Sequence, residues 1–468
     1  MKESGGSCID FIPAFPQDES LFFYLRHDGL PADFEGKEKL RRLRLYFRAS
    51  ACCDSLPMVL QINNENDSVA RRKHHLVQPC PMIVGTGPQL APAQERTIRA
   101  ILDAHWESWM CEETPQPCES NVYDAASPSP PPSLAVVMPR NIENDPAYIE
   151  HDISFHMTRT ARTAGFETTF FAADAITYSG SEGYHDEFTK LVSFLEAGKP
   201  NIVAIDGNYR PNNPATIFTF KRALSPDDMA KLRLQFGFQL IVVIPDCHDL
   251  APDYLSDWGP VADLVVTFHK DSESYRSFPT KGKVLVCPSI PFAAELFTPR
   301  EKKDIGLSYI GSDTRERSTF MAAAEAAGLD TLIRMHDRRR ETAPDTEEFA
   351  SLLARSNLSF NNGWQSEGPA IITGRVAETI LAGGVLVQEI GSALDDYLVP
   401  FVHYVPVSNT HQLVAYSRFL LAHDEHRTRI ADEGRKFWLE HYRSERFWAK
   451  ALAILCSERP AHIDQSKE

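Results

Sequence analysis

The amino-acid sequence predicts an α/β protein with two successive doubly wound domains and an additional N-terminal region. Three observations support this fold class. From residue 134 onwards, short continuous apolar runs alternate with helical stretches, which is the pattern of parallel sheets covered on both faces. The alternation starts again near residue 305. The chain has 468 residues, enough for about three domains of roughly 150 residues each.

The N-terminal region ends in a proline-rich segment. Residues 127–133 read Ser-Pro-Ser-Pro-Pro-Pro-Ser, which favours an extended spacer over a packed element. We therefore divide the chain into an extension of unknown fold (1–126), a linker (127–133) and two α/β domains (134–290 and 300–456). One helix is expected in the extension, at 94–109. The spacer predicts that residues 134–468 fold without the extension; the alternative is an extension packed across the interdomain cleft.

The elements of the first α/β domain follow from its apolar runs in order. Continuous runs of four to seven residues predict strands, and longer stretches with helical periodicity predict the helices between them. The predicted strands are 134–138, 168–171, 202–205, 240–244, 262–268 and 284–287, and the predicted helices are 148–164, 187–197 and 226–236.

The second domain repeats the same alternation. Strands are predicted at 307–310, 331–335, 358–360 and 385–388, and helices at 318–327, 349–355 and 375–381. Gly383-Gly384 follows the last of these helices and fits the left-handed helix stop that favours glycine. Because such sheets bind ligands at the carboxyl ends of their strands, function is expected in the loops that follow the strands.

Composition and charge exclude several classes of protein. The chain carries 48 lysines and arginines against 64 aspartates and glutamates, a net charge of −16. A molecule this acidic repels nucleic-acid backbones and anionic lipid at long range, although a local basic pocket for one phosphorylated ligand remains compatible with it. No apolar run is long enough to cross a membrane, and the N-terminus lacks the pattern of a secretory signal.

The nine cysteines indicate reduced thiols in a cytoplasmic protein. Six of them lie in the first 118 residues, no Cys-x-x-Cys occurs, and the Cys52-Cys53 pair is too tight for the usual zinc spacing. Other familiar motifs are also missing, namely Gly-x-Gly-x-x-Gly, the Walker loop, His-Glu-x-x-His and Gly-x-Ser-x-Gly. Nor does the chain contain an Asp-x-Asp pair, which often holds a divalent ion against a nucleotide diphosphate.

Three segments carry candidate chemistry. In residues 307–317 a strand enters a turn at Gly311 and Ser312, where Ser312 or Asp313 is expected to cap a helix whose first turn holds Arg317. Free backbone N–H groups and guanidinium donors would meet there and could hold an anion. The alternative is a plain strand–turn–helix with solvated arginines.

The second segment is 374–384. Arg375 and Glu378 lie three residues apart, on one face near the start of a helix. An arginine at a helix N-terminus suits a pyrophosphate, and a carboxylate suits a vicinal diol such as a ribose. A simple Arg–Glu surface pair is the alternative.

The third segment, 244–249, places Asp246 and His248 after a strand, where His248 could act as a general base or Asp246 could merely cap a turn.

Together these segments resemble the CgeB-type glycosyltransferases, which belong to the GT-B fold of two facing Rossmann-like domains. The similarity rests on the order and spacing of residues 262–267, 288–299, 305–317, 374–384 and 403–434, and it covers about 134–456. The resemblance implies transfer of a sugar from a nucleotide-diphosphate donor to a hydroxyl acceptor, with Glu378 at the donor's ribose. One departure is that Ala370 stands where many retaining relatives have a glutamate, and the nearest acid upstream is Glu367. The anomeric outcome therefore stays open.

The resulting hypothesis is a metal-independent glycosyltransferase that needs no cofactor besides its donor. Arg317 and Arg375 would stabilise the departing diphosphate, and Gly311 and Ser312 would add backbone donors. His248 or Asp246 would take the acceptor proton in an inverting reaction. The acceptor could be a glycan, a protein or a small molecule. Two alternatives remain, a GT-B-shaped binding or assembly protein without catalysis and a sugar-nucleotide epimerase.

Overall fold

The computed structural model describes twelve stretches of the chain. They are residues 11–13, 20–25, 48–50, 89–111, 132–141, 147–173, 181–207, 224–244, 257–268, 283–363, 371–390 and 392–457. The first three are short strands, β1 (Phe11–Pro13), β2 (Ser20–Leu25) and β3 (Arg48–Ser50), which pair antiparallel in that order.

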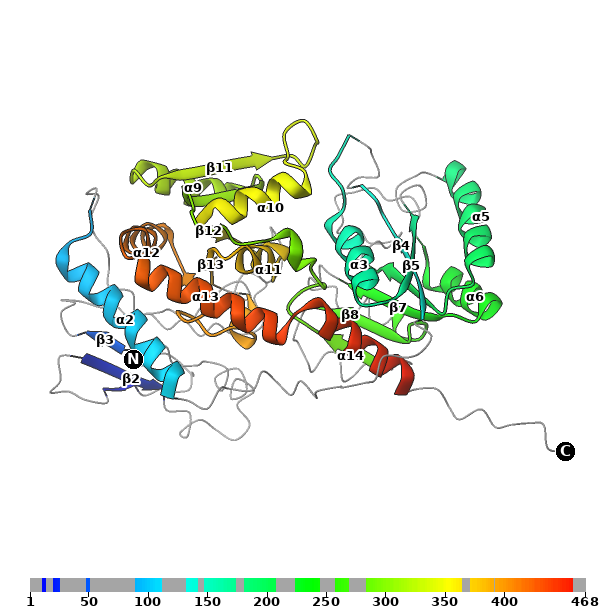
Figure 1. Cartoon of the computed structure of the whole chain (residues 1–468), viewed down its shortest axis with the longest axis horizontal. Coiled ribbons are helices and arrows are strands. Elements are labelled where there is room, and N and C mark those ends of the chain that lie inside the picture. The colour runs from blue at the N-terminus through cyan, green and yellow to red at the C-terminus, as the bar shows by residue number, and fades with distance from the viewer. Residues whose placement is uncertain are drawn as a thin grey trace, which may run out of the picture.

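The N-terminal α/β domain is built on a parallel sheet. Within the described residues its strand order is β5-β4-β6-β7-β8-β9, so the order reverses between β4 and β6. Helices cover this sheet (Figure 1). The strands are β4 (Ser133–Met138), β5 (Glu167–Ala172), β6 (Ile202–Asp206), β7 (Gln239–Ile244), β8 (Leu264–Thr267) and β9 (Lys283–Val286), and the helices are α3 (Asp152–Thr163), α5 (Ser181–Gly198) and α6 (Pro226–Phe236).

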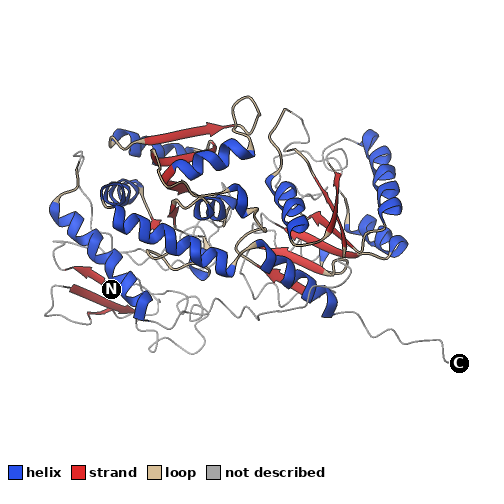
Figure 2. Ribbon diagram, viewed as in Figure 1, coloured by secondary structure: helices blue, strands red, loops and turns tan. Residues whose placement is uncertain are grey.

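The C-terminal α/β domain repeats this plan with the order β11-β10-β12-β13-β14, again all parallel, and its order reverses between β10 and β12. Figure 2 shows its strands lying among helices. The strands are β10 (Ile305–Ser312), β11 (Thr331–His336), β12 (Ser356–Asn361), β13 (Val385–Glu389) and β14 (Val405–Val407); the helices are α9 (Arg315–Ala326), α10 (Thr346–Arg355), α11 (Gly374–Leu381), α12 (Thr410–Ala422) and α13 (Asp424–His441).

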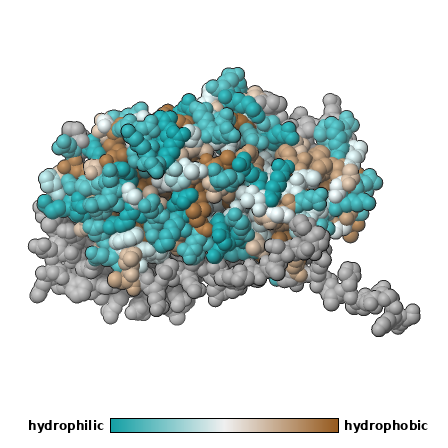
Figure 3. Space-filling view, viewed as in Figure 1, coloured by the Kyte–Doolittle hydropathy of each residue, from teal (hydrophilic) through white to brown (hydrophobic). Residues whose placement is uncertain are grey.

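The two predicted doubly wound domains are confirmed, because every strand predicted from residue 134 to residue 388 is present. Continuous apolar runs form strands that are buried on both faces; in β7, for example, Leu240 to Ile244 are at most 1% exposed. Hydrophilic residues cover much of the described surface in Figure 3, as expected when helices turn their apolar faces towards the sheets.

The last helix, α14 (Ser444–Ser457), connects the two domains. It follows α13 of the C-terminal domain and packs on α3 and β8 of the N-terminal domain. The Trp448 side chain is 1% exposed, and its Nε1 donates to Thr160 Oγ1 at 3.1 Å. This buried contact ties the end of the chain to the first domain.

The expected helix in the extension is present as α2 (Pro92–Cys111), but it is not separate from the domains. Ile98 and Leu102 lie in one apolar cluster with Phe401 and Phe419 of the C-terminal domain. Helix α2 lies against α12 and α13 of that domain. This packing argues against the expectation that residues 134–468 fold without the extension. A boundary at residue 126 would divide a single core.

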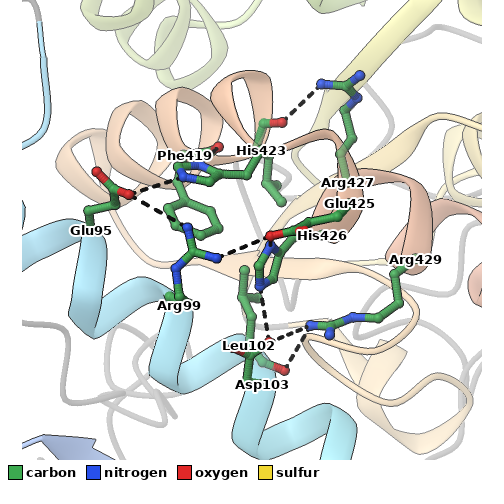
Figure 4. Close-up of polar contacts among 11 residues, drawn as sticks. Glu95, Arg99, Leu102, Asp103, Phe419, His423, Glu425, His426, Arg427 and Arg429 are labelled. Carbon is green, nitrogen blue, oxygen red and sulfur yellow. Dashed lines mark hydrogen bonds and ion pairs between the residues drawn. The ribbon is translucent and has the colours of Figure 1, made fainter.

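Polar contacts accompany the apolar packing of α2 on the C-terminal domain (Figure 4). Asp103 of α2 accepts from Arg429 at 3.1 Å and lies 3.0 Å from His426 Nε2. Glu95 lies 3.1 Å from His423 Nε2. The helix therefore docks through both packing and hydrogen bonds.

Candidate functional site

The carboxyl end of β10 leads into the first part of the site. The expected cap is displaced, since Thr314, not Ser312 or Asp313, is the N-cap of α9 and accepts from the Arg317 backbone N–H at 3.4 Å. Asp313 instead accepts from the Ser318 hydroxyl at 2.5 Å. Ser312 accepts from Arg317 Nη1 through both its carbonyl, at 3.1 Å, and its hydroxyl, at 3.0 Å. The turn therefore orients the guanidinium of Arg317.

Arg375, at the start of α11, supplies a second guanidinium. Its Nη1 donates to Asn361 Oδ1 at 3.0 Å, at the carboxyl end of β12. Its terminal Nη2 lies so close to Gly311 that a Cβ on Gly311 would overlap it. Glycine at position 311 thus leaves room for the guanidinium against the backbone of β10.

Tyr309 brings the two arginines together. The guanidinium carbon of Arg375 lies 5.2 Å from the centroid of the Tyr309 ring, and that of Arg317 lies 6.0 Å from it. The Tyr309 hydroxyl donates to the Ser312 carbonyl at 2.9 Å, which fixes the ring. Because these groups stand where the strand order reverses, they occupy the position at which open α/β sheets bind ligands.

No ion pair joins Arg317 or Arg375 to a carboxylate within the described stretches. The Nε atom of each guanidinium is buried and has no hydrogen-bond partner there. Burial lowers the pKa of Arg317, and the positive charges of Arg375 and Arg338 act in the same direction. Both side chains are half-buried, and charge that is partly removed from water is costly without a counter-charge, so this arrangement could hold an anion. We call Arg317 and Arg375 the anion cluster.

A polar network supports the arginines from β12 and β13. Asn361 Nδ2 donates to Gln388 Oε1 at 2.7 Å, and Asn362 Nδ2 donates to the carboxyl of Glu389. Burial, together with the charge of Glu316, raises the pKa of Glu389 to about 8. Burial thus favours the neutral form of Glu389, while Asn362 and Arg317 favour its charged form.

Glu378 differs from its expected setting. The alternative from the sequence was a surface pair near the helix start, but the side chain is 7% exposed, and its carboxyl lies next to Gly374. No hydrogen bond or ion pair to it is found among the described residues. Burial, then the negative charge of Asp152, raises its pKa to about 8, while Arg375 acts against this. The simple surface pair of Arg375 with Glu378 is therefore also wrong.

The structure adds residues that the motifs did not single out. Asp152, at the start of α3 in the N-terminal domain, acts electrostatically on both Glu378 and His336. Burial lowers the pKa of His336, at the end of β11, as do Arg375 and Arg338. A sequence signal existed, because the polar run 336–340 directly follows a predicted strand, as Arg317 does.

Four residues of the sequence argument lie outside the described residues. They are the acid–base candidates Asp246 and His248, together with Ala370 and Glu367. Of the candidate residues, the structure brings together Gly311, Ser312, Arg317, Arg375 and Glu378 around the carboxyl end of β10 and the start of α11. Across the described stretches no cluster of three or more His, Cys, Asp or Glu side chains suits a metal ion. No helix there has the length and hydropathy needed to cross a membrane.

Comparison with known proteins agrees with this geometry. A family model described as glycosyl transferase-like matches residues 307–453, which contain both arginines. The chain is similar to the sucrose-phosphate synthase of Thermosynechococcus elongatus, at 12% identity and a TM-score of 0.50 over 69% of this chain and 98% of that one. No curated protein sequence matches significantly.

Two further solved structures are similar over the same part of the chain. One is a glycosyltransferase of Rickettsia africae, at 9% identity and a TM-score of 0.45 over 70% of this chain and 98% of that one. The other is HepE of Anabaena in complex with UDP and glucose, at 10% identity and a TM-score of 0.44 over 69% and 99%. With its two parallel-sheet domains, the chain has the GT-B fold.

Proposed function

We propose that this GT-B protein is a glycosyltransferase that moves a sugar from a nucleotide-diphosphate donor to a hydroxyl acceptor. The observation that carries the proposal is the pair of half-buried guanidinium groups of Arg317 and Arg375, whose Nε atoms are buried without a partner and which form no ion pair with a carboxylate among the described residues. They stand where the strand order of the C-terminal sheet reverses. The glycosyl transferase-like match over 307–453 supports the same activity.

Sugar transfer from a nucleotide diphosphate requires positive groups beside the leaving diphosphate. As the bond between the anomeric carbon and the diphosphate breaks, negative charge builds on the leaving diphosphate, and preorganised positive groups stabilise it. Arg317 is held rigidly by Ser312 and by the carbonyl of Asn362 at 3.1 Å. Its orientation therefore needs little rearrangement during the reaction. The backbone of Gly311 and Ser312 lines the same turn, and we propose that its N–H groups face the diphosphate.

Glu378 is proposed to hold the ribose of the donor. A carboxylate can accept hydrogen bonds from two adjacent hydroxyls, and a buried group without a partner among the described residues gains most from doing so. Arg375, which already lowers the pKa of Glu378, would favour its charged form when the donor binds. Asp246 or His248 remains our candidate for the acceptor proton in an inverting reaction.

The remaining parts of the proposal follow from the sequence. The protein would work without a divalent ion, because arginines and helix N-termini take over the neutralisation of the diphosphate. It would act in the cytoplasm, on a glycan, protein or small-molecule acceptor. The CgeB-type subfamily is proposed on the resemblance of about residues 134–456 to that group.

The test is nucleotide release by the purified full-length protein from a panel of UDP- and GDP-sugars. Arg317→Ala and Arg375→Ala should each lose UDP affinity, measured by calorimetry, by about tenfold or more. The matched control is Arg334→Ala, an exposed arginine of β11 that pairs with Glu348. Donor binding without turnover would indicate a binding protein, product formation without acceptor would indicate an epimerase, and no binding would refute the donor site.

A further inference from the structure

The two domains pair directly through backbone beside the candidate site. The Arg340 backbone N–H donates to the Ala147 carbonyl at 2.8 Å, and the Ile149 N–H donates to the Arg338 carbonyl at 3.0 Å. Between these bonds, Tyr148 and Arg339 form an antiparallel bridge. We call residues 338–340 and 147–149, with Asn141, the clasp.

The Arg340 side chain strengthens the clasp. Its Nε donates to the Tyr148 carbonyl at 2.8 Å, and its Nη2 donates to Asn141 Oδ1 at 3.0 Å. Asn141 is only 8% exposed, so this second bond is shielded from water. The guanidinium carbon of Arg339 also lies 5.7 Å from the centroid of the Tyr148 ring. The Arg340 side chain thus forms hydrogen bonds with two residues of the N-terminal domain.

The clasp stands where both sheets present ligands. Asn141 and residues 147–149 lie between the carboxyl end of β4 and the start of α3, and residues 337–345 follow the carboxyl end of β11. β4 is a strand at which the order of its sheet reverses, the expected place of a ligand crevice. Contact here brings the acceptor-side domain against the edge that carries Arg317 and Arg375.

The loop after β11 is braced to present Arg340. Asp337 Oδ1 accepts from the Arg339 N–H at 3.1 Å and from the Thr342 hydroxyl at 2.8 Å. Arg338 has a φ of +69°, a left-handed conformation that costs energy for a residue with a side chain. Its N–H donates to His336 Nδ1 at 3.1 Å, and His336 lies in the field of Arg375. The clasp is therefore connected to the anion cluster through His336.

We propose that Arg340 is a positioning residue that holds the two domains closed over the anion cluster during sugar transfer. This inference rests on the proposed function. The residues that we assign to the donor all belong to the C-terminal domain, so the nucleotide can bind without the clasp. Transfer needs both domains, because closure brings the acceptor side to the donor and excludes water.

The first test is a cross-link that is independent of activity. Opposed residues of an antiparallel pair have Cα atoms about 4.5–5.5 Å apart, within the reach of a disulfide. Under mild oxidation, the full-length Tyr148→Cys/Arg339→Cys variant should form this interdomain disulfide, identified by peptide mass spectrometry. The control is Tyr148→Cys/Arg334→Cys, since Arg334 lies five residues earlier and pairs with Glu348. Equal cross-linking in the two variants, or none, would overturn the clasp.

The second test separates closure from donor binding. Arg340→Ala should lower the kcat of transfer by about tenfold or more, while the Kd for UDP changes less than about twofold. Arg340→Lys, which keeps the charge but loses the two-sided guanidinium, should recover part of kcat. Unchanged kcat, or a loss of UDP affinity as large as the loss of kcat, would overturn the role. If the wild type transfers no sugar, the proposed function fails, and the cross-link still decides the clasp.

Discussion

Replacing Glu378 with Gln should stabilise the ligand-free protein at neutral pH while weakening donor binding. The carboxyl is 7% exposed, and its pKa rises from the ordinary 4.5 to about 8, chiefly through burial. Between pH 4.5 and 8 the folded protein keeps a proton that the unfolded chain releases. The free energy of unfolding therefore falls as pH rises through this window. The stabilising contribution of the proton on Glu378 is fully present only below pH 4.5.

The magnitude follows from the pKa difference. A pH of 7 is 2.5 units above the pKa of 4.5 that the carboxyl has in the unfolded chain. Each unit is worth about 1.36 kcal/mol, so burial of the carboxyl lowers the free energy of unfolding by about 3 kcal/mol at pH 7. Glutamine has no such cost. The same substitution removes the proposed charge-assisted hydrogen bond to the ribose, worth about 1.5–3 kcal/mol, so the Kd for the donor should rise about 10- to 100-fold.

Thermal unfolding of both proteins at pH 5 and pH 8, without ligand, measures the first effect, and calorimetry with UDP measures the second. The melting temperature of Glu378→Gln should exceed that of the wild type by several degrees at pH 8 and by little at pH 5, at about 2–4 °C per kcal/mol. Glu347→Gln, an exposed position in the first turn of α10, is the control and should show no such pH dependence.

Two results would refute this reasoning. If Glu378→Gln melts below the wild type at pH 8, the carboxylate has a stabilising partner in the folded protein. If the stability difference is the same at pH 5 and pH 8, the carboxyl does not titrate as its burial requires. An unchanged Kd for UDP would separately remove Glu378 from the donor site.

Three further predictions concern Gly311, α2 and metal. Gly311→Ala should displace the flexible end of Arg375 and weaken UDP binding about tenfold, and it should also lower the melting temperature, because a φ of +158° strains a residue with a side chain; equal affinity in calorimetry would contradict the packing of Arg375 on β10. Leu102→Ala, at a fully buried position of α2, should cost about 2–5 kcal/mol in a urea unfolding assay. A fragment 134–468 that melts like the full chain would show instead that α2 is dispensable. Transfer should persist in excess EDTA, and a loss that magnesium or manganese restores would argue for a metal-dependent enzyme.

Local sequence determined much of the fold. Helix α6 has its predicted bounds because Ser225 caps its start, with its side chain accepting from the Asp228 N–H at 3.1 Å, and Gly237 ends it at a φ of +76°. The stop predicted at Gly383 is also present, with a φ of +69°. The N–H groups of Gly383 and Gly384 donate to Ile380 and Thr379, so they satisfy carbonyls at the end of α11. Such signals act within a few residues and can be read from neighbours in the chain.

The donor-side candidates were also accessible from the sequence, because parallel sheets bind ligands at the carboxyl ends of strands. Gly311 lies at the carboxyl end of β10, Arg317 in the first turn of α9 and Arg375 at the start of α11, so the pattern alone places them at the edge where such sheets bind ligands. Their common contact with Tyr309 was not accessible, since a tyrosine inside an apolar strand looks like any core residue.

Only the tertiary structure decided how polar groups are surrounded. The sequence predicts Glu378 in the first turn of a helix, where glutamate is usually solvated, yet it lies in the middle of α11 and its burial raises its pKa. Helix α2 has an ordinary amphipathic pattern, and only long-range packing shows that its apolar face completes the C-terminal domain. The clasp joins residues nearly 200 positions apart. Periodicity and caps depend on near neighbours in the chain, whereas burial, pKa and interdomain bonds depend on partners that the fold brings from afar.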